Sequence, residues 1–197
     1  MLLSGFQEDG ALSMYPEFSW CPTDYDPRFR PWYSTAATNP KLIIVVIDVS
    51  GSMGTNDRIG LARSAALAVL DTLTWNDEVG FILFNNGLEE VYPITACTDD
   101  NRVAMKSWAN SNIIPGGGTN FAIPLRHAFQ MIESSSSTVC TKAILFLTDG
   151  VASFSDSDYT YVTEKAEANE VIMFTYALGS GMSLLRMKNF YFLIMHV

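Results

Sequence analysis

The sequence predicts an α/β fold, in which helices cover both faces of a doubly wound and mostly parallel β-sheet. The prediction depends on three apolar runs, residues 42–47, 143–147 and 171–178, which have the length and composition of buried strands. Segments with the apolar period of a helix lie between these runs. Strands that alternate with amphipathic helices form parallel sheets, because each crossover helix packs back onto the sheet.

The predicted elements follow one another from residue 41 onward. A helix over 58–73 comes after the first strand, and Asn56 or Asp57 can cap its start. The strand 79–84 ends in a turn signal, so the short strand 88–94 is expected to be antiparallel to it or to lie at an edge. The remaining predicted elements are a helix over 100–113 with Val103, Trp108 and Ile113 turned partly inward, a helix over 121–132, the strand 143–147, a helix over 159–169, the strand 171–178, a helix over 183–189 and a strand over 190–195.

Composition excludes several classes of partner and site. The net charge of −9 argues against nucleic acid or an anionic membrane as the main partner, and it favours a cation or a partner with basic surroundings. No apolar run approaches the roughly 18 residues of a membrane span, and the first residues lack the pattern of a signal peptide. Three scattered cysteines are too few for a zinc site, which leaves open either a Cys97–Cys140 disulfide or free thiols.

Five oxygen-bearing side chains follow strands or a glycine-rich turn. Asp48 and Asp149 each stand at the end of a predicted strand, where open α/β sheets bind their ligands. Ser50 and Ser52 come directly after Asp48, and Thr119 follows three glycines that let the backbone come close. Such a hard, all-oxygen set suits Mg²⁺, Mn²⁺ or Ca²⁺, and it does not suit Zn²⁺ or Cu²⁺.

The charge of this set favours binding over catalysis. Two carboxylates balance a divalent cation formally, but hydroxyl ligands with water-mediated carboxylates would leave the ion electrophilic. An open coordination position would then attract a carboxylate from outside. No residue of the set is an obvious general base, and the motifs of a phosphate-binding loop and of a serine hydrolase are absent. His127, on a predicted helix, is expected to be solvated.

Three motifs together resemble the metal-ion-dependent adhesion site of von Willebrand factor A domains. They are Asp48-Val-Ser-Gly-Ser-Met53, Gly117-Gly-Thr119-Asn120 and Leu147-Thr-Asp149-Gly150. The resemblance covers roughly residues 41–179 and implies a Rossmann-like fold. It also implies a Mg²⁺ ion held by Ser50, Ser52 and Thr119, with Asp48 and Asp149 bound to it directly or through water. The residues after 179 are few for this family, so the domain over 41–197 is expected to be incomplete at its C-terminal end.

The segment before the first strand extends the resemblance. Residues 25–33, which include Arg30, Trp32 and Tyr33, resemble the junction between Cache and von Willebrand A domains in the alpha-2-delta auxiliary subunits of voltage-gated calcium channels. Residues 1–40 are therefore expected to be a C-terminal remnant of a Cache-type module plus a linker. The Arg-x-Trp-Tyr pattern also resembles the amino-acid-binding signature of double Cache sensors, in which the Arg and Trp help hold a ligand carboxylate, and the resemblance implies the same candidate role for Arg30, Trp32 and Tyr33. Most of a Cache module is missing here, which favours a packing role for Trp32 and Tyr33.

The resemblance implies a non-enzymatic, metal-dependent protein-binding module. Its partner would present an Asp or Glu to the ion, and a channel subunit is one candidate. The protein would act outside the cell or at its surface. Two other readings stay open: a fragment of an amino-acid sensor that uses Arg30 and Trp32, and an intracellular von Willebrand A scaffold in which the metal is structural.

Overall fold

The computed structural model of the chain describes residues 2–5, 12–15, 39–137, 139, 141–149, 154–178 and 191–195. It divides into two units, Met1–Asn39 and Pro40–Val197, which are considered separately. In the first unit, β1 (Leu2–Gly5) and β2 (Leu12–Tyr15) form an antiparallel pair. Arg30, Trp32 and Tyr33, together with the predicted helix over 183–189, lie outside the described residues.

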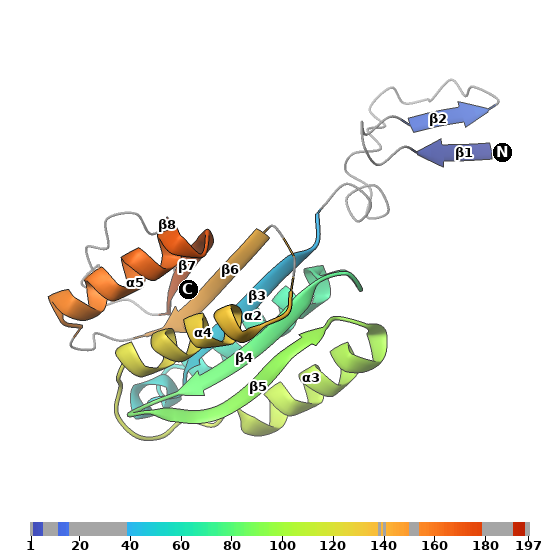
Figure 1. The fold of residues 1–197 in the computed structure, drawn as a ribbon. Helices are drawn as coiled ribbons and strands as arrows, with labels where there is room; N and C mark the ends of the chain where they lie inside the picture. Colours follow the sequence, from blue (N-terminus) through green and yellow to red (C-terminus); the bar gives the residue numbers. More distant parts are fainter. Residues whose placement is uncertain are drawn as a thin grey trace. The chain divides into compact units, whose positions relative to one another are not determined.

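The second unit is built on a six-stranded sheet with the strand order β5-β4-β3-β6-β7-β8 (Figure 1). Its strands are β3 (Lys41–Asp48), β4 (Glu78–Phe84), β5 (Leu88–Ala96), β6 (Thr141–Thr148), β7 (Val171–Leu178) and β8 (Tyr191–Met195). β5 pairs antiparallel with β4 at one edge, and the other neighbours pair in parallel. The prediction of a doubly wound, mostly parallel sheet is thus confirmed.

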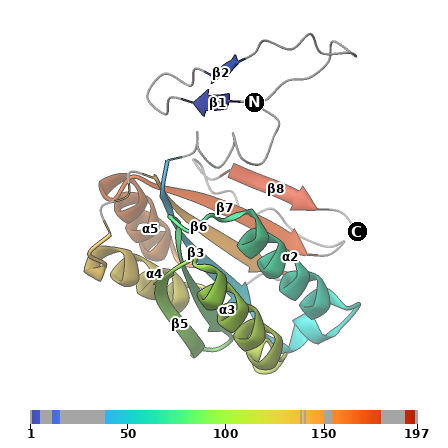
Figure 2. The ribbon, with the colours of Figure 1, turned by 90° about the vertical axis from the view of Figure 1, so that its right-hand side faces the viewer.

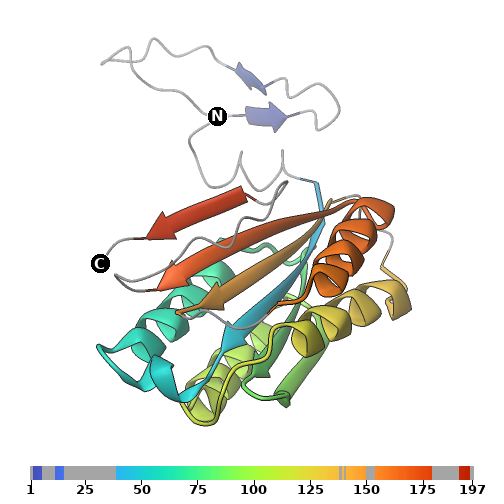
Figure 3. The same cartoon turned by 90° about the vertical axis from the view of Figure 1, so that its left-hand side faces the viewer.

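Helices cover both faces of this sheet. Figures 2 and 3 show α2 (Arg58–Thr72) and α3 (Asp99–Asn112) on one face, and α4 (Ala122–Ser134) and α5 (Asp156–Ala168) on the other. Two buried cores result because alternate residues of the central strands point to opposite faces. Val45 and Ile47 pack toward α2 and α3, whereas Ile44 and Val46 pack toward α4 and α5.

Two local expectations about the helices are wrong. Val103 is 70% exposed, and the inward face of α3 instead carries Met105 and Ala109. A residue two positions before Met105 points away from it, because only residues three or four apart share a helix face. Asp57 does precede α2, but its backbone is left-handed and its side chain makes no capping hydrogen bond.

The order of the strands reverses direction at β3. β3 pairs with β4 on one side and with β6 on the other, so the connections leave it in opposite directions. The carboxyl ends of neighbouring parallel strands at such a reversal form a crevice. Asp48 closes β3 there, and Asp149 follows directly after β6. The sheet therefore brings together residues from distant parts of the chain.

An aromatic cluster supports this edge from within the core. Phe84, at the end of β4, lies with its ring centroid 5.3 Å from that of Phe146 in β6. Phe121, just before α4, packs edge-on against Phe146 at 5.1 Å. Such contacts between aromatic rings add to the gain from their burial. The cluster anchors the start of α4, and with it the loop that carries Thr119.

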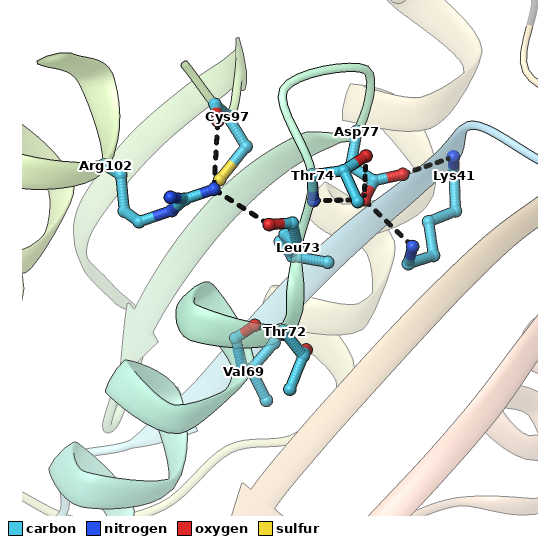
Figure 4. A network of polar contacts seen from close by, with 8 residues as sticks. All are labelled: Lys41, Val69, Thr72, Leu73, Thr74, Asp77, Cys97 and Arg102. Carbon is cyan, nitrogen blue, oxygen red and sulfur yellow. Dashed lines mark hydrogen bonds and ion pairs between the residues drawn. The ribbon is translucent and has the colours of Figure 1, made fainter. Parts of the chain in front are cut away.

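The opposite end of the sheet is held by a buried carboxylate. Asp77 is 1% exposed and accepts hydrogen bonds from the backbone and side chain of both Lys41 and Thr74 (Figure 4). Nearby, Arg102 donates to the carbonyl oxygens of Leu73 and Cys97. These contacts join the first residue of β3 to the turn before β4 and to the end of β5.

Cys97 carries a buried, free thiol, so the disulfide alternative is not realised. Within the described part of the chain, no helix has the length and hydrophobicity needed to cross a bilayer.

Candidate metal site

The loop after β3 begins with a buried carboxylate. Asp48 is 0% exposed, and its Oδ1 atom accepts a hydrogen bond of 2.8 Å from the backbone N–H of Ser50. The short 3-10 helix η2 (Gly51–Gly54) follows and turns Ser52 back toward Ser50. Their two Oγ atoms lie 3.1 Å apart. The spacing of Asp48, Ser50 and Ser52 in the sequence thus becomes a cluster of oxygen atoms.

The loop after β6 completes this cluster. Ser52 donates its hydroxyl proton to Oδ1 of Asp149 over 2.9 Å. Thr148, the last residue of β6, donates to Oδ2 of Asp48 over 2.6 Å. Four of the five predicted metal ligands therefore form one continuous set of hydrogen bonds, although Asp48 and Asp149 come from different strands.

The loop that carries Thr119 is bonded to the same place. Gly116 donates to the carbonyl oxygen of Val49 over 2.7 Å, and Gly117 accepts from the backbone N–H of Gly51 over 2.9 Å. The half-buried Thr119 follows two residues later. These backbone bonds place the Gly-rich loop against the loop of Ser50 and Ser52.

Gly117 permits this close approach, which leads to a first prediction. Its φ is +78°, and a Cβ atom there would lie 2.8 Å from Nδ2 of Asn85. Gly117→Ala is expected to cost about 1–3 kcal/mol of unfolding free energy and to weaken Mg²⁺ binding by displacing the Thr119 loop. Chemical denaturation and calorimetric titration with Mg²⁺ measure the two effects. Gly116→Ala is the matched control, because a Cβ there meets nothing within 4 Å. Equal Mg²⁺ affinities for the two variants would contradict the prediction.

The donor chemistry of the cluster fits a hard divalent cation. Ser52 gives its single proton to Asp149, so it accepts the hydrogen bond that it shares with Ser50, and one lone pair of its hydroxyl oxygen stays available to an ion. Burial raises the pKa of Asp48 above its ordinary value; hydrogen bonds from Ser50 and Thr148 lower it in part, and the charge of Asp149 raises it further. Burial removes the water that would otherwise solvate the negative charge of Asp48. A bound cation would compensate for that loss.

Two residues of the site were not predicted from the sequence as site residues. Arg58, the first residue of α2, donates through Nη1 to Oδ2 of Asp149 over 2.6 Å. A positive charge at a helix N-terminus opposes the helix dipole, and α2 has no acidic residue in its first turn. That mismatch is the signal that could have identified Arg58. Thr148 had no comparable signal, since its role depends on the pairing of β6 with β3.

A cavity of about 500 Å³ lies elsewhere in the domain. Glu78, Ile94, His127, Met131 and Ser137 are among its lining residues, and none of the five predicted metal ligands is. His127 is therefore half-buried at a cavity wall and not simply solvated. Over the described residues, no three His, Cys, Asp or Glu side chains gather as a metal site.

Comparison with known proteins agrees with this architecture. The chain is 33% identical over 196 residues to the human voltage-dependent calcium channel subunit alpha-2/delta-4, covering 91% of this chain and 17% of the relative. It is 30% identical over 188 residues to subunit alpha-2/delta-3 of Rattus norvegicus, covering 86% of this chain and 17% of the relative. The chain thus spans only a small part of both relatives.

A solved structure and a family model give the same result for the fold. The von Willebrand factor type A structure from Catenulispora acidiphila, 23% identical, superposes with a TM-score of 0.62 over 73% of this chain and 34% of that chain. A model of the von Willebrand factor type A domain family matches residues 43–151, more than half of the chain. The chain therefore belongs to the von Willebrand factor type A domain family.

Proposed function

We propose that this chain is a non-enzymatic binding module that holds Mg²⁺ and, through the ion, an acidic side chain of a protein partner. Ser50, Ser52 and Thr119 would supply hydroxyl ligands. Asp48 and Asp149 would bind the ion directly or through water. Mn²⁺ or Ca²⁺ would suit the same oxygen donors.

One observation carries the proposal: hydrogen bonds join Asp48, Ser50, Ser52 and Asp149 in a single cluster at the carboxyl edge of the sheet. Hydrogen bonds hold both carboxylates of the cluster in place. Asp48 accepts from Ser50 and Thr148, while Asp149 accepts from Ser52 and Arg58. Each of these oxygens accepts one hydrogen bond and keeps a second lone pair, which an ion can use. Two fixed carboxylates beside the hydroxyls of Ser50 and Ser52 form a hard oxygen-donor set that fits a divalent ion.

The alpha-2/delta relatives suggest a wider setting. We propose that the chain is part of an auxiliary protein of this type, displayed outside the cell or at its surface. A subunit of a cation channel is then a candidate partner. An Asp or Glu on the partner would enter the open coordination position of the ion.

A binding experiment with purified channel subunit tests the proposal. Immobilised chain is expected to capture the subunit in Mg²⁺ and to lose it when a chelator is added. Asp48→Asn should abolish capture because the variant removes a negative charge from the site. Asp71→Ala is the matched control, since Asp71 is 60% exposed and pairs with Lys106 on the surface. Capture that survives both the chelator and Asp48→Asn would refute the proposal.

A further inference from the structure

We infer that Arg58 sets the charge of the loaded metal site and thereby directs it toward acidic ligands. This inference rests on the proposed function, because it concerns the same ion. Among the residues that the structure describes, Arg58 is the one positively charged side chain that contacts a predicted ligand. Its guanidinium contacts Asp149, which the proposal treats as a ligand or as a partner of a bound water.

The contact between Arg58 and Asp149 is close and largely enclosed. Nη1 of Arg58 lies 2.6 Å from Oδ2 of Asp149, whose side chain is fully buried. The Arg58 side chain is 23% exposed, and its Nε atom is buried without a hydrogen-bond partner. Screening by solvent is therefore weaker than for a surface ion pair. The positive charge of Arg58 is held where it acts on the site.

The backbone before Arg58 adopts an energetically unfavourable conformation. Asn56 and Asp57 both have positive φ, 53° and 55°, which is unfavourable for residues other than glycine. Gly60 leaves room for the Asp57 carboxylate, because a Cβ there would lie 2.3 Å from Oδ1 of Asp57. This turn brings Arg58 to the first position of α2, where the helix dipole disfavours its charge. The contact with Asp149 offsets these costs.

The charge of Arg58 has opposite effects on the affinity for the ion and on the affinity for an incoming carboxylate. Asp48 and Asp149 carry two negative charges, and Arg58 cancels one of them. A divalent ion then leaves the loaded site with an excess of one positive charge. Without Arg58, the two carboxylates would balance the charge of the ion, and the loaded site would have no net charge. Arg58 consequently weakens the affinity for the cation and strengthens the affinity for a carboxylate that approaches the cation.

Calorimetric titration of the full chain with Mg²⁺ tests the first effect. Arg58→Gln is expected to bind Mg²⁺ at least about tenfold more tightly than the wild type, since it removes a nearby positive charge. Arg58→Lys keeps the charge and should remain close to the wild type. Arg63→Gln is the matched control, because Arg63 lies on the same helix and donates to the carbonyl oxygen of Ile113. Arg58→Met serves as a second variant without the charge if the Gln variant does not fold.

Acetate binding to the Mn²⁺-loaded chain tests the second effect. A carboxylate that displaces water from Mn²⁺ lowers the relaxation rate of water protons. Arg58→Gln is expected to bind acetate several-fold more weakly than the wild type and Arg63→Gln. Equal or weaker Mg²⁺ affinity in Arg58→Gln, or unchanged acetate binding, would overturn the role of Arg58 and leave the proposed function intact. A wild-type chain that binds neither Mg²⁺ nor Mn²⁺ would overturn both.

Discussion

Saturating Mg²⁺ is expected to raise the free energy of unfolding of the chain by about 2.7 kcal/mol when the free ion reaches about 100 times its dissociation constant. The unfolded chain does not bring the five predicted ligands together, so the ion binds the folded state preferentially. For a domain of this size, the gain corresponds to a rise in Tm of roughly 5–11 °C. Thermal melting with and without Mg²⁺ measures it.

The double substitution Ser50→Ala, Ser52→Ala is expected to abolish this response. It removes two hydroxyl oxygens that lie 3.1 Å apart, while Asp48 and Asp149 stay in place. It also removes the hydrogen bond from Ser52 to Asp149, so the metal-free Tm will fall somewhat. The informative quantity is therefore the difference in Tm between the two conditions.

A matched double variant controls for the loss of serine itself. Ser107→Ala, Ser111→Ala removes two exposed hydroxyls from the surface of α3 and should leave the Mg²⁺ response unchanged. An equal Mg²⁺ response in both double variants would contradict the assignment of Ser50 and Ser52 as ligands. A wild-type chain whose Tm does not change when Mg²⁺ is added would contradict the metal site as a whole.

Asp77→Ala is expected to lower the free energy of unfolding by about 3–5 kcal/mol, the range for removing one partner of a buried ion pair. The side chain of Asp77 is 1% exposed and that of Lys41 is 24% exposed. Four hydrogen-bond donors of Lys41 and Thr74 would lose their acceptor at once (Figure 4). Urea denaturation measures the change. Asp71→Ala, at a surface ion pair, should change stability by less than about 1 kcal/mol.

The carboxylate of Asp77 also makes the free energy of unfolding depend on pH, and its surroundings set the direction of that dependence. Burial raises the pKa of Asp77, but hydrogen bonds from Lys41 and Thr74 and the charge of Lys41 lower it more, so the pKa lies below its ordinary value of 3.8. The folded state then binds the proton more weakly than the unfolded state. The stabilisation is present above pH 3.8 and is lost as the pH falls through the lower pKa of the folded state.

Comparison of the wild type with Asp77→Ala isolates the contribution of Asp77 to the pH dependence. The pKa of Asp48 is shifted in the opposite direction, so the total acid dependence combines both groups. The difference in unfolding free energy between the wild type and Asp77→Ala should shrink as the pH falls below 3.8. A difference that stays constant or grows on acidification would show that Asp77 does not act through its ionised form.

Most strands and helices were predictable because their signals are local. The run 42–47 contains only aliphatic residues, so it fits a strand buried on both faces, as β3 is. Val103 was misjudged because an apolar residue in a helix does not reveal which face meets the sheet. That face depends on how α3 packs, which places Met105 and Ala109 inward.

The sequence by itself determined the α/β class, the strand ends and the oxygen-bearing residues, since these depend on neighbours a few positions apart. Only the tertiary structure decided that Thr148 bonds to Asp48, 100 residues away, and that Arg58 pairs with Asp149, 91 residues away. Such contacts arise from the register between β3 and β6 and from the direction in which α2 leaves its loop. Both are set by packing of the whole domain, which no short stretch of sequence encodes.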